Sequence, residues 1–215
     1  MASKVDWNSM GGTKSGGPGG KKQINYLKFE AGKGKTFRPV GEAVQFCKFF
    51  VNGKSVVVDP EFKDQAAAII SSETGQEYVG KTRFAINVID REDNQIKVLE
   101  GGPQIFKHFG NWSRGNNNAG PGSVNAMDWM ITASGQGLNR EYVTTPIRST
   151  TLTNDEIDRC KNKKELFSLQ EIYKSMPVNE IPKRLFDKSA ASPEAAEPVM
   201  AGTDVASASE DVSSW

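Results

Sequence analysis

The segment VQFCKFFVNGKSVVVDP (residues 44–60) carries two strands and the turn that joins them. Val44–Val51 is rich in aromatic and β-branched side chains, which favour strands. Asn52-Gly53 is a strong signal for a two-residue hairpin turn, so Lys54–Val58 is expected to return as the partner strand. Asp59-Pro60 then predicts the start of a short helix, with Asp as N-cap and Pro at the first helical position.

Short strands, turns and small helices continue along the chain. The apolar alternation of Arg83–Ile89 predicts a strand that forms a second hairpin with Ile96–Leu99, and Ala126–Ala133 is expected to form a third with Glu141–Ile147. Helices are expected over Pro103–Phe109, Asn154–Lys161 and Lys164–Lys174, with Pro177 and Pro182 ending regular structure. The pattern predicts a mainly β fold, and the strand count favours an OB-fold-like five-stranded barrel with short peripheral helices.

Composition divides the 215 residues into three parts. Residues 1–22 are expected to form a flexible Gly-rich basic arm, residues 23–188 an OB-like nucleic-acid-binding domain, and residues 189–215 a disordered acidic tail. The tail has five acidic side chains and no Lys or Arg, which leaves the rest of the chain at a net charge of +6. Glu210 and Asp211 precede the final residue, Trp215, a combination typical of a tethered peptide ligand. This charge division favours a basic ligand-binding body, although a solvated basic face would show the same excess.

Several function classes find little support in the residues. Cys47 and Cys160 follow no metal or redox spacing, and His108 is the single histidine, so neither a metal site nor a cofactor is predicted. No paired carboxylates or nucleophile–base spacing stands out, so the chain is not predicted to be an enzyme. The absence of a long apolar run and of a signal peptide predicts a soluble, intracellular protein with no membrane partner.

The segment AGKGKT (residues 31–36) tests the possibility of a nucleotide hydrolase. A phosphate-binding loop requires Gly at the position that Phe29 occupies, and it must lead into a helix N-terminus. Residues 37–40 read instead as a strand. A basic, Gly-rich turn that enters a strand is therefore the better interpretation, and such a turn can still contact phosphate.

Cations alternate with aromatic rings along the body, as single-stranded nucleic acid requires, because cations follow the phosphates while rings stack on unpaired bases. Most rings in a barrel belong to its core, and the alternation around Lys48 leaves open whether Phe46 and Phe50 or Cys47 and Phe49 face outward. Trp112 and Tyr142 are expected to stack on bases. The residues expected to contact DNA are Lys33, Lys35, Arg38, Lys48, Lys54, Lys81, Arg83, Trp112, Arg114, Arg140 and Tyr142.

Three stretches of the body resemble the single-stranded DNA-binding proteins of tailed bacteriophages. They are YLKFEAGKGKTFRPVG (residues 26–41), VLEGGPQIFKHF (98–109) and MDWMITASGQGLNREY (127–142). The resemblance implies an oligonucleotide-binding fold and sequence-independent binding of single strands in replication, recombination and repair within the cytoplasm of an infected bacterium. It also implies that the tail, through Glu210, Asp211 and Trp215, binds the phage polymerase, helicase, primase or other replication proteins. Some relatives carry a structural zinc, for which this chain lacks the ligands.

Two alternatives to a binder of single strands remain open from the sequence. One is a structural or adaptor protein in which the tail binds a partner and the body is a scaffold. The other is a strand-annealing recombination protein, which lies close to a binder of single strands. The residues do not decide between a monomer and a homo-oligomer.

Overall fold

Strand β2 (Gly34–Val51) organises the sheet. The computed structural model describes residues 4–5, 24–115, 123–135, 140–161 and 165–186. Within them, β2 pairs with β4 along one edge and, in succession, with β6, β1 and β3 along the other. Two outer strands extend the main path to the order β5-β4-β2-β6-β7, and all pairings between strands are antiparallel. The other strands are β1 (Lys4–Val5), β3 (Lys54–Val58), β4 (Lys81–Asp90), β5 (Ile96–Gly101), β6 (Met127–Ser134) and β7 (Glu141–Ser149).

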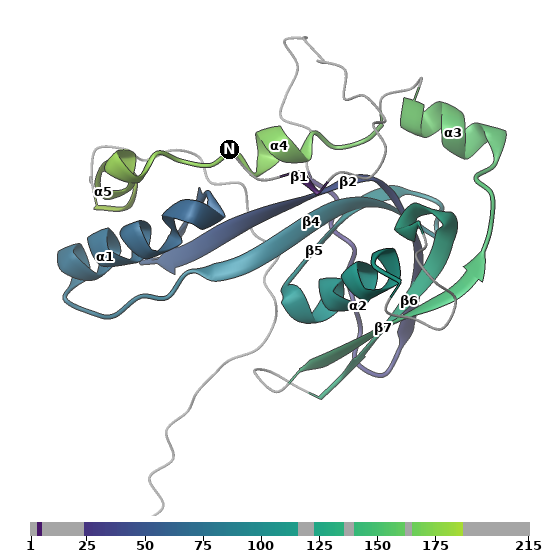
Figure 1. Ribbon diagram of the computed structural model, residues 1–215, viewed down its shortest axis with the longest axis horizontal. Coiled ribbons are helices and arrows are strands. Elements are labelled where there is room, and N and C mark those ends of the chain that lie inside the picture. Colours follow the sequence, from purple (N-terminus) through teal and green to yellow (C-terminus); the bar gives the residue numbers. More distant parts are fainter. Residues whose placement is uncertain (1–3, 6–23, 116–122, 136–139, 162–164, 187–215) are drawn as a thin grey trace, which may run out of the picture.

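A bulge in β2 allows this one strand to pair with several other strands. The register against β4 shifts between Val40 and Val44, and Gly41 adopts a φ of 78°, a conformation that favours glycine. A bulge bends its strand and increases the local twist. The two halves of β2 therefore run in different directions, and each half has its own neighbours (Figure 1).

Short helices lie on both sides of this sheet (Figure 1). Helix α2 contacts β4, β5 and β7, whereas α1 and α5 contact each other at the end of the sheet where β2 turns into β3. The helices are α1 (Lys63–Thr74), α2 (Pro103–Ser113), α3 (Asn154–Lys161), α4 (Leu169–Ile172) and α5 (Ile181–Phe186), with single turns η1 (Pro60–Phe62), η2 (Val124–Ala126) and η4 (Val178–Glu180). None of the described helices has the length and apolar character that crossing a membrane requires.

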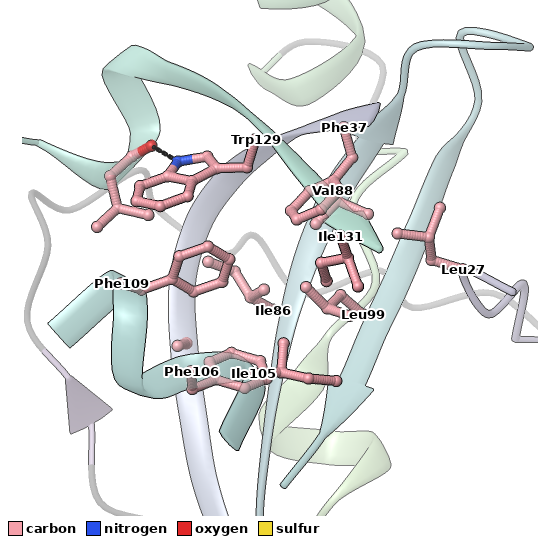
Figure 2. Close-up of a cluster of buried hydrophobic side chains, with 12 residues drawn as sticks. Leu27, Phe37, Ile86, Val88, Leu99, Ile105, Phe106, Phe109, Trp129 and Ile131 are labelled. Carbon is pink, nitrogen blue, oxygen red and sulfur yellow. Dashed lines mark hydrogen bonds between the residues drawn. The ribbon is translucent and has the colours of Figure 1, made fainter. Parts of the chain in front are cut away.

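The largest hydrophobic cluster lies between the sheet and α2 (Figure 2). Phe109 contacts Phe37 and Trp129 in edge-to-face geometry, with ring centroids 6.2 and 4.6 Å apart. The Trp129 indole Nε1 donates a hydrogen bond of 3.0 Å to the carbonyl of Val124, which satisfies its polar atom inside the core. Ile86 extends the same cluster from β4. This face of the sheet is therefore packed.

The opposite face is covered in its middle by residues 165–176, here named the C-terminal strap. The side chain of Asn87 holds the strap at Phe167 by two hydrogen bonds of 3.0 Å, one to its backbone N–H and one to its carbonyl. Farther along, Tyr173 stacks on Phe46 with ring centroids 4.2 Å apart. The strap ends where the Met176 N–H donates to the carbonyl of Val57. Both faces of the central sheet are thus covered at this level.

Residues 24–32 run along the remaining gap. The backbone of Asn25 and Leu27 bonds to Val98 on β5, and the Gly32 N–H donates to the carbonyl of Ala133 on β6. In the described residues β5 and β7 do not pair with each other, so the sheet is not closed. The mainly β fold with short helices is confirmed, whereas closure into a barrel is not.

The predicted hairpins and most helices appear at the expected positions, with some differences. The expected helix over 164–174 is reduced to Leu169–Ile172. Pro182 does not end regular structure, because it occupies the first turn of α5, where proline is tolerated. Within the expected arm, Lys4–Val5 pairs with β2. The rest of that arm, the tail 189–215 with Glu210, Asp211 and Trp215, and parts of two loops (116–122 and 136–139) lie outside the described residues.

A buried carboxylate joins the strands near the start of β2. Asp128 on β6 is 1% exposed and accepts hydrogen bonds of 2.9 Å from Arg38 Nε and Arg91 Nη2. Arg91 also pairs with Glu156 on α3. Burial alone would raise the pKa of Asp128, but the hydrogen bonds and charges of the two arginines outweigh it and lower that pKa. The carboxylate is therefore charged in the folded protein.

We expect Asp128→Asn to lower the free energy of unfolding by about 3 kcal/mol, because it leaves the buried Arg38 guanidinium without its anion and removes one of the two carboxylates that bind Arg91. Asp128 has a lower pKa when folded than when unfolded, so its stabilising effect is complete above the unfolded pKa of about 4 and is lost as the pH falls below it. Chemical denaturation at several pH values between 2 and 7 measures both effects. A variant as stable as the parent protein, with the same dependence on acid, would contradict this role.

Candidate nucleic-acid interface

Three of the cations predicted to bind DNA meet in one groove at the end of the sheet that the strap leaves uncovered. Lys48 comes from β2, and Lys81 and Arg83 come from β4. The groove has a volume of about 480 Å3. We name it the basic groove; it is lined by Lys48, Phe49, Phe50, Tyr78, Val79, Lys81, Arg83 and Glu100.

Strand register explains why these side chains meet. Arg83 lies opposite Phe46, and Lys81 lies opposite Lys48, so all four share one face of the β2–β4 pair. Phe50 is the next residue of β2 on that face. The strap covers the face at Phe46, through Tyr173, and the face becomes accessible from Lys48 onward. The alternation left open by the sequence is thus resolved, since both Phe46 and Phe49 are buried and Phe50 is exposed.

The groove offers exposed apolar surface beside its cations. Phe50 is 60% exposed and Val79 is 68% exposed, and both line the same groove. Gly80 brings the Tyr78-Val79 segment close to β2, because a Cβ at this position would lie 2.5 Å from both Cys47 Sγ and Phe49 Cζ. An exposed ring next to positive charge matches the needs of a ligand that has both phosphates and bases.

One acidic residue, Glu100 on β5, belongs to the groove. Its Oε1 lies 3.7 Å from Lys48 Nζ, and its Oε2 accepts a hydrogen bond of 2.8 Å from the hydroxyl of Tyr173. Burial, together with the nearby charge of Glu100, raises the pKa of Tyr173 far above its ordinary value, so this hydroxyl stays protonated and remains a donor. Lys81 and Arg83 form no ion pair with any other described residue. The positive charge of the groove is therefore only partly neutralised by its own walls.

Other residues that were predicted to contact DNA bind groups of the protein itself. Arg38 is 1% exposed, and its guanidinium binds Asp128 and the carbonyl of Asn125, so we remove it from the set expected to contact DNA. The amino group of Lys35 lies 2.8 Å from Asp90 and 2.5 Å from Glu92. Exposed Lys33 pairs with Glu30, and Lys54 reaches the carbonyl of Leu185 at 3.5 Å. These residues do not line the groove.

The remaining predicted residues lie in or directly beside α2 and β7, two neighbouring elements outside the groove. Trp112 is half-buried against the core, with its ring 5.9 Å from that of Trp129, so it is less accessible than predicted. Tyr142 contacts Phe29 edge to face at 5.9 Å and also packs against the core. Arg114 is exposed beside Asn111, whereas Arg140 is partly buried. The structure thus brings Lys48, Lys81 and Arg83 together in the groove and places these four residues outside it.

Five residues of the groove were missing from the sequence-based set, and one of them, Phe49, is buried between Lys48 and Phe50 in the chain. Phe50 continues the row of Phe46 and Lys48 by alternation, which was the available signal. Tyr78 and Val79 lie in an irregular segment and carry no periodic pattern. Glu100 pairs with a residue more than fifty positions away in the chain, so no local signal could reveal it.

Metal and thiol chemistry find no support in the described part of the chain. No group of three or more His, Cys, Asp or Glu side chains is placed there to hold a metal ion. Cys47 and Cys160 are buried, and burial raises the pKa of both thiols, which makes them poor nucleophiles at neutral pH.

Comparisons with known proteins add no relative. No protein-family profile matches the chain, and no curated protein is significantly similar to it in sequence. The functional proposal therefore depends on the geometry and charge of the groove.

The charges of the groove lead to a prediction about the stability of the protein without a ligand. Lys48 and Lys81 lie directly opposite each other across the β2–β4 pair, and like charges in that position are destabilising. We expect Lys81→Gln to raise the free energy of unfolding by about 0.5 kcal/mol at low salt, and the gain to shrink in 0.5 M salt because salt screens the repulsion. Thermal unfolding at both salt concentrations measures the effect.

Lys107→Gln provides the control, because Lys107 is exposed on α2 outside the groove. An equal change in both variants, or a loss of stability in Lys81→Gln that salt does not alter, would contradict repulsion across the groove.

Proposed function

We propose that this protein binds single-stranded DNA without sequence preference, and that the strand lies in the basic groove. The observation that carries the proposal is the exposed ring of Phe50 beside Lys48, Lys81 and Arg83. An aromatic ring exposed to water, and three cations placed close together, contribute little to the stability of a folded protein. A single strand supplies what both groups lack, namely phosphates for the cations and unpaired bases for the ring.

The chemistry of binding follows from the side chains. Lys81 and Arg83 hold phosphate oxygens, and Arg83 can do so with two parallel hydrogen bonds. Phe50 stacks on a base through its ring face, which favours no particular base because every base has a π-face. Binding is consequently strong at low salt and tolerant of sequence.

Strand order supports an OB-like barrel as the underlying architecture. Without the short β1 and β3, the strands follow each other along the chain as β2, β4, β5, β6 and β7, with α2 between the third and the fourth. In OB folds, which are partly open five-stranded barrels, the face of the second and third strands binds oligonucleotides. The corresponding strands here are β4 and β5, which supply Lys81, Arg83 and Glu100. In the proposed barrel, Asn25 and Leu27 bond to the outer strand β5 and Gly32 bonds to β6.

The biological setting that fits this activity is the replication, recombination and repair of phage DNA in the cytoplasm of the infected host. The protein would act without catalysis or cofactor, by coating exposed strands. Its acidic tail, with Glu210, Asp211 and Trp215, would recruit the polymerase, helicase or primase. Strand annealing is compatible with the same groove.

Titration of a fluorescent oligo(dT) by anisotropy at several salt concentrations tests the proposal. Phe50→Ala should weaken binding by about 1–3 kcal/mol at every salt concentration, because it removes a stacking surface. Lys81→Gln and Arg83→Gln should each weaken binding mainly at low salt and reduce the slope of log K against log salt by about 0.7.

Matched variants outside the groove serve as controls. Phe62 is 42% exposed on η1 and Lys161 is exposed on α3, so Phe62→Ala and Lys161→Gln should leave the affinity unchanged. Duplex DNA and RNA of the same length establish which nucleic acid the groove prefers. Groove variants that bind oligo(dT) as tightly as the parent protein would overturn this assignment of the site. A protein that shows no binding of single strands at low salt would favour the adaptor hypothesis.

A further inference from the structure

Two stacked aromatic rings lie where the basic groove meets the strap. Tyr173 of the strap covers Phe46 of β2, with ring centroids 4.2 Å apart and an angle of 17° between the ring planes. Arg83 lies opposite Phe46 across the strands and lines the groove. Glu100, which accepts a hydrogen bond of 2.8 Å from the Tyr173 hydroxyl, also lines the groove. The stacked pair therefore borders the groove directly.

We propose that Phe46 is a second base-stacking position, which the Tyr173 ring fills in the free protein and which a base of the bound strand takes over. This inference rests on the proposed function. Phe46 and Phe50 lie on the same face of β2, so a strand that stacks one base on Phe50 is led along this row toward Phe46. A nearly parallel ring at 4.2 Å is also the arrangement that an unpaired base adopts on an aromatic side chain. Tyr173 thus occupies the place of a base.

The exchange of one ring for another keeps Phe46 covered in both states. Phe46 is buried in the free protein, and the incoming base replaces the ring that buries it. The exchange costs mainly the hydrogen bond from Tyr173 to Glu100 and the packing of the Tyr173 ring. Stacking of the base on Phe46 offsets this cost. Only the difference between the two contributes to affinity.

The strap can make this exchange without leaving the sheet. Hydrogen bonds to the sheet hold it on both sides of Tyr173, at Phe167 and at Met176. Between these anchors its regular structure is the single turn α4, which has no side-chain cap. The Ser175 hydroxyl is buried and has no hydrogen-bond partner among the described residues, which disfavours the arrangement of the free protein. A local movement that carries Tyr173 outward also brings this hydroxyl to water.

Hydroxyl-radical footprinting of the full chain, read by mass spectrometry with and without oligo(dT), tests the exchange directly. Tyr173 is buried and should become more reactive when the strand binds, whereas a residue with a purely structural role would stay protected. Tyr78 lines the groove and should become less reactive, and Phe62 on η1 should not change. A Tyr173 that remains unreactive at saturating oligo(dT) would overturn the exchange.

Two variants provide a second test by anisotropy titration with oligo(dT). Tyr173→Phe keeps a ring on Phe46 but loses the bond to Glu100, so the strand should bind about two- to tenfold more tightly. Phe46→Leu removes the stacking surface and should weaken binding about tenfold at every salt concentration. Phe109→Leu is the control, because it truncates an equally buried ring in the cluster around α2 and should leave the affinity unchanged.

The footprint of the parent protein does not depend on whether either variant folds. Weaker or unchanged binding by folded Tyr173→Phe would overturn the proposal, as would parental affinity in folded Phe46→Leu. These outcomes differ from failure of the proposed function, in which Phe50→Ala and Arg83→Gln would have no effect on binding.

Discussion

The ion pair between Arg38 and Asp128 is the interaction on which the geometry of the sheet depends. Strand β6 pairs with β2 only over Gly34–Phe37, a short ladder for a connection that carries β6 and β7. The buried pair lies at the end of this ladder, and Arg91 extends it to the turn that follows β4. Three segments are thereby fixed at one point. A buried ion pair is weak as a source of net stability, but it is specific, because removing either partner leaves an unpaired charge in the interior.

The second half of β2 lies away from the Arg38–Asp128 ion pair and has a different role. The strand is 18 residues long and bends at the bulge that follows Val40, so its second half projects with β4 beyond the cluster around α2 (Figure 1). Helices α1 and α5 cover one side of this projection, where Phe49 is buried. The strap covers the other side only as far as Phe46. The exposed positions that follow therefore result from where the strap ends, and they form the wall of the groove.

Local patterns predicted the elements well, but tertiary partners decided what the charged residues do. Turn residues and alternation located the hairpins, and the helix expected from Pro103 appeared as α2. Arg38 looked like Lys48 in the sequence, since both are cations beside aromatic residues. Asp128 is 90 positions away from Arg38, and no local pattern reveals that partner. The unclosed edges of the sheet have a similar cause, because pairing between edges depends on segments far apart in the chain.

The ion pairs of the groove differ from those around Asp90 and Glu165. Lys35 and Lys97 share the buried carboxylate of Asp90, and Arg159 pairs with Glu165, so these cations are neutralised where they stand. In the groove two lysines face each other across the strands, and one carboxylate serves only one of them. Ordinary selection for stability would separate or neutralise such charges, since like charges directly opposite destabilise a strand pair. Under the proposed function, a bound strand supplies the negative charge that this arrangement lacks.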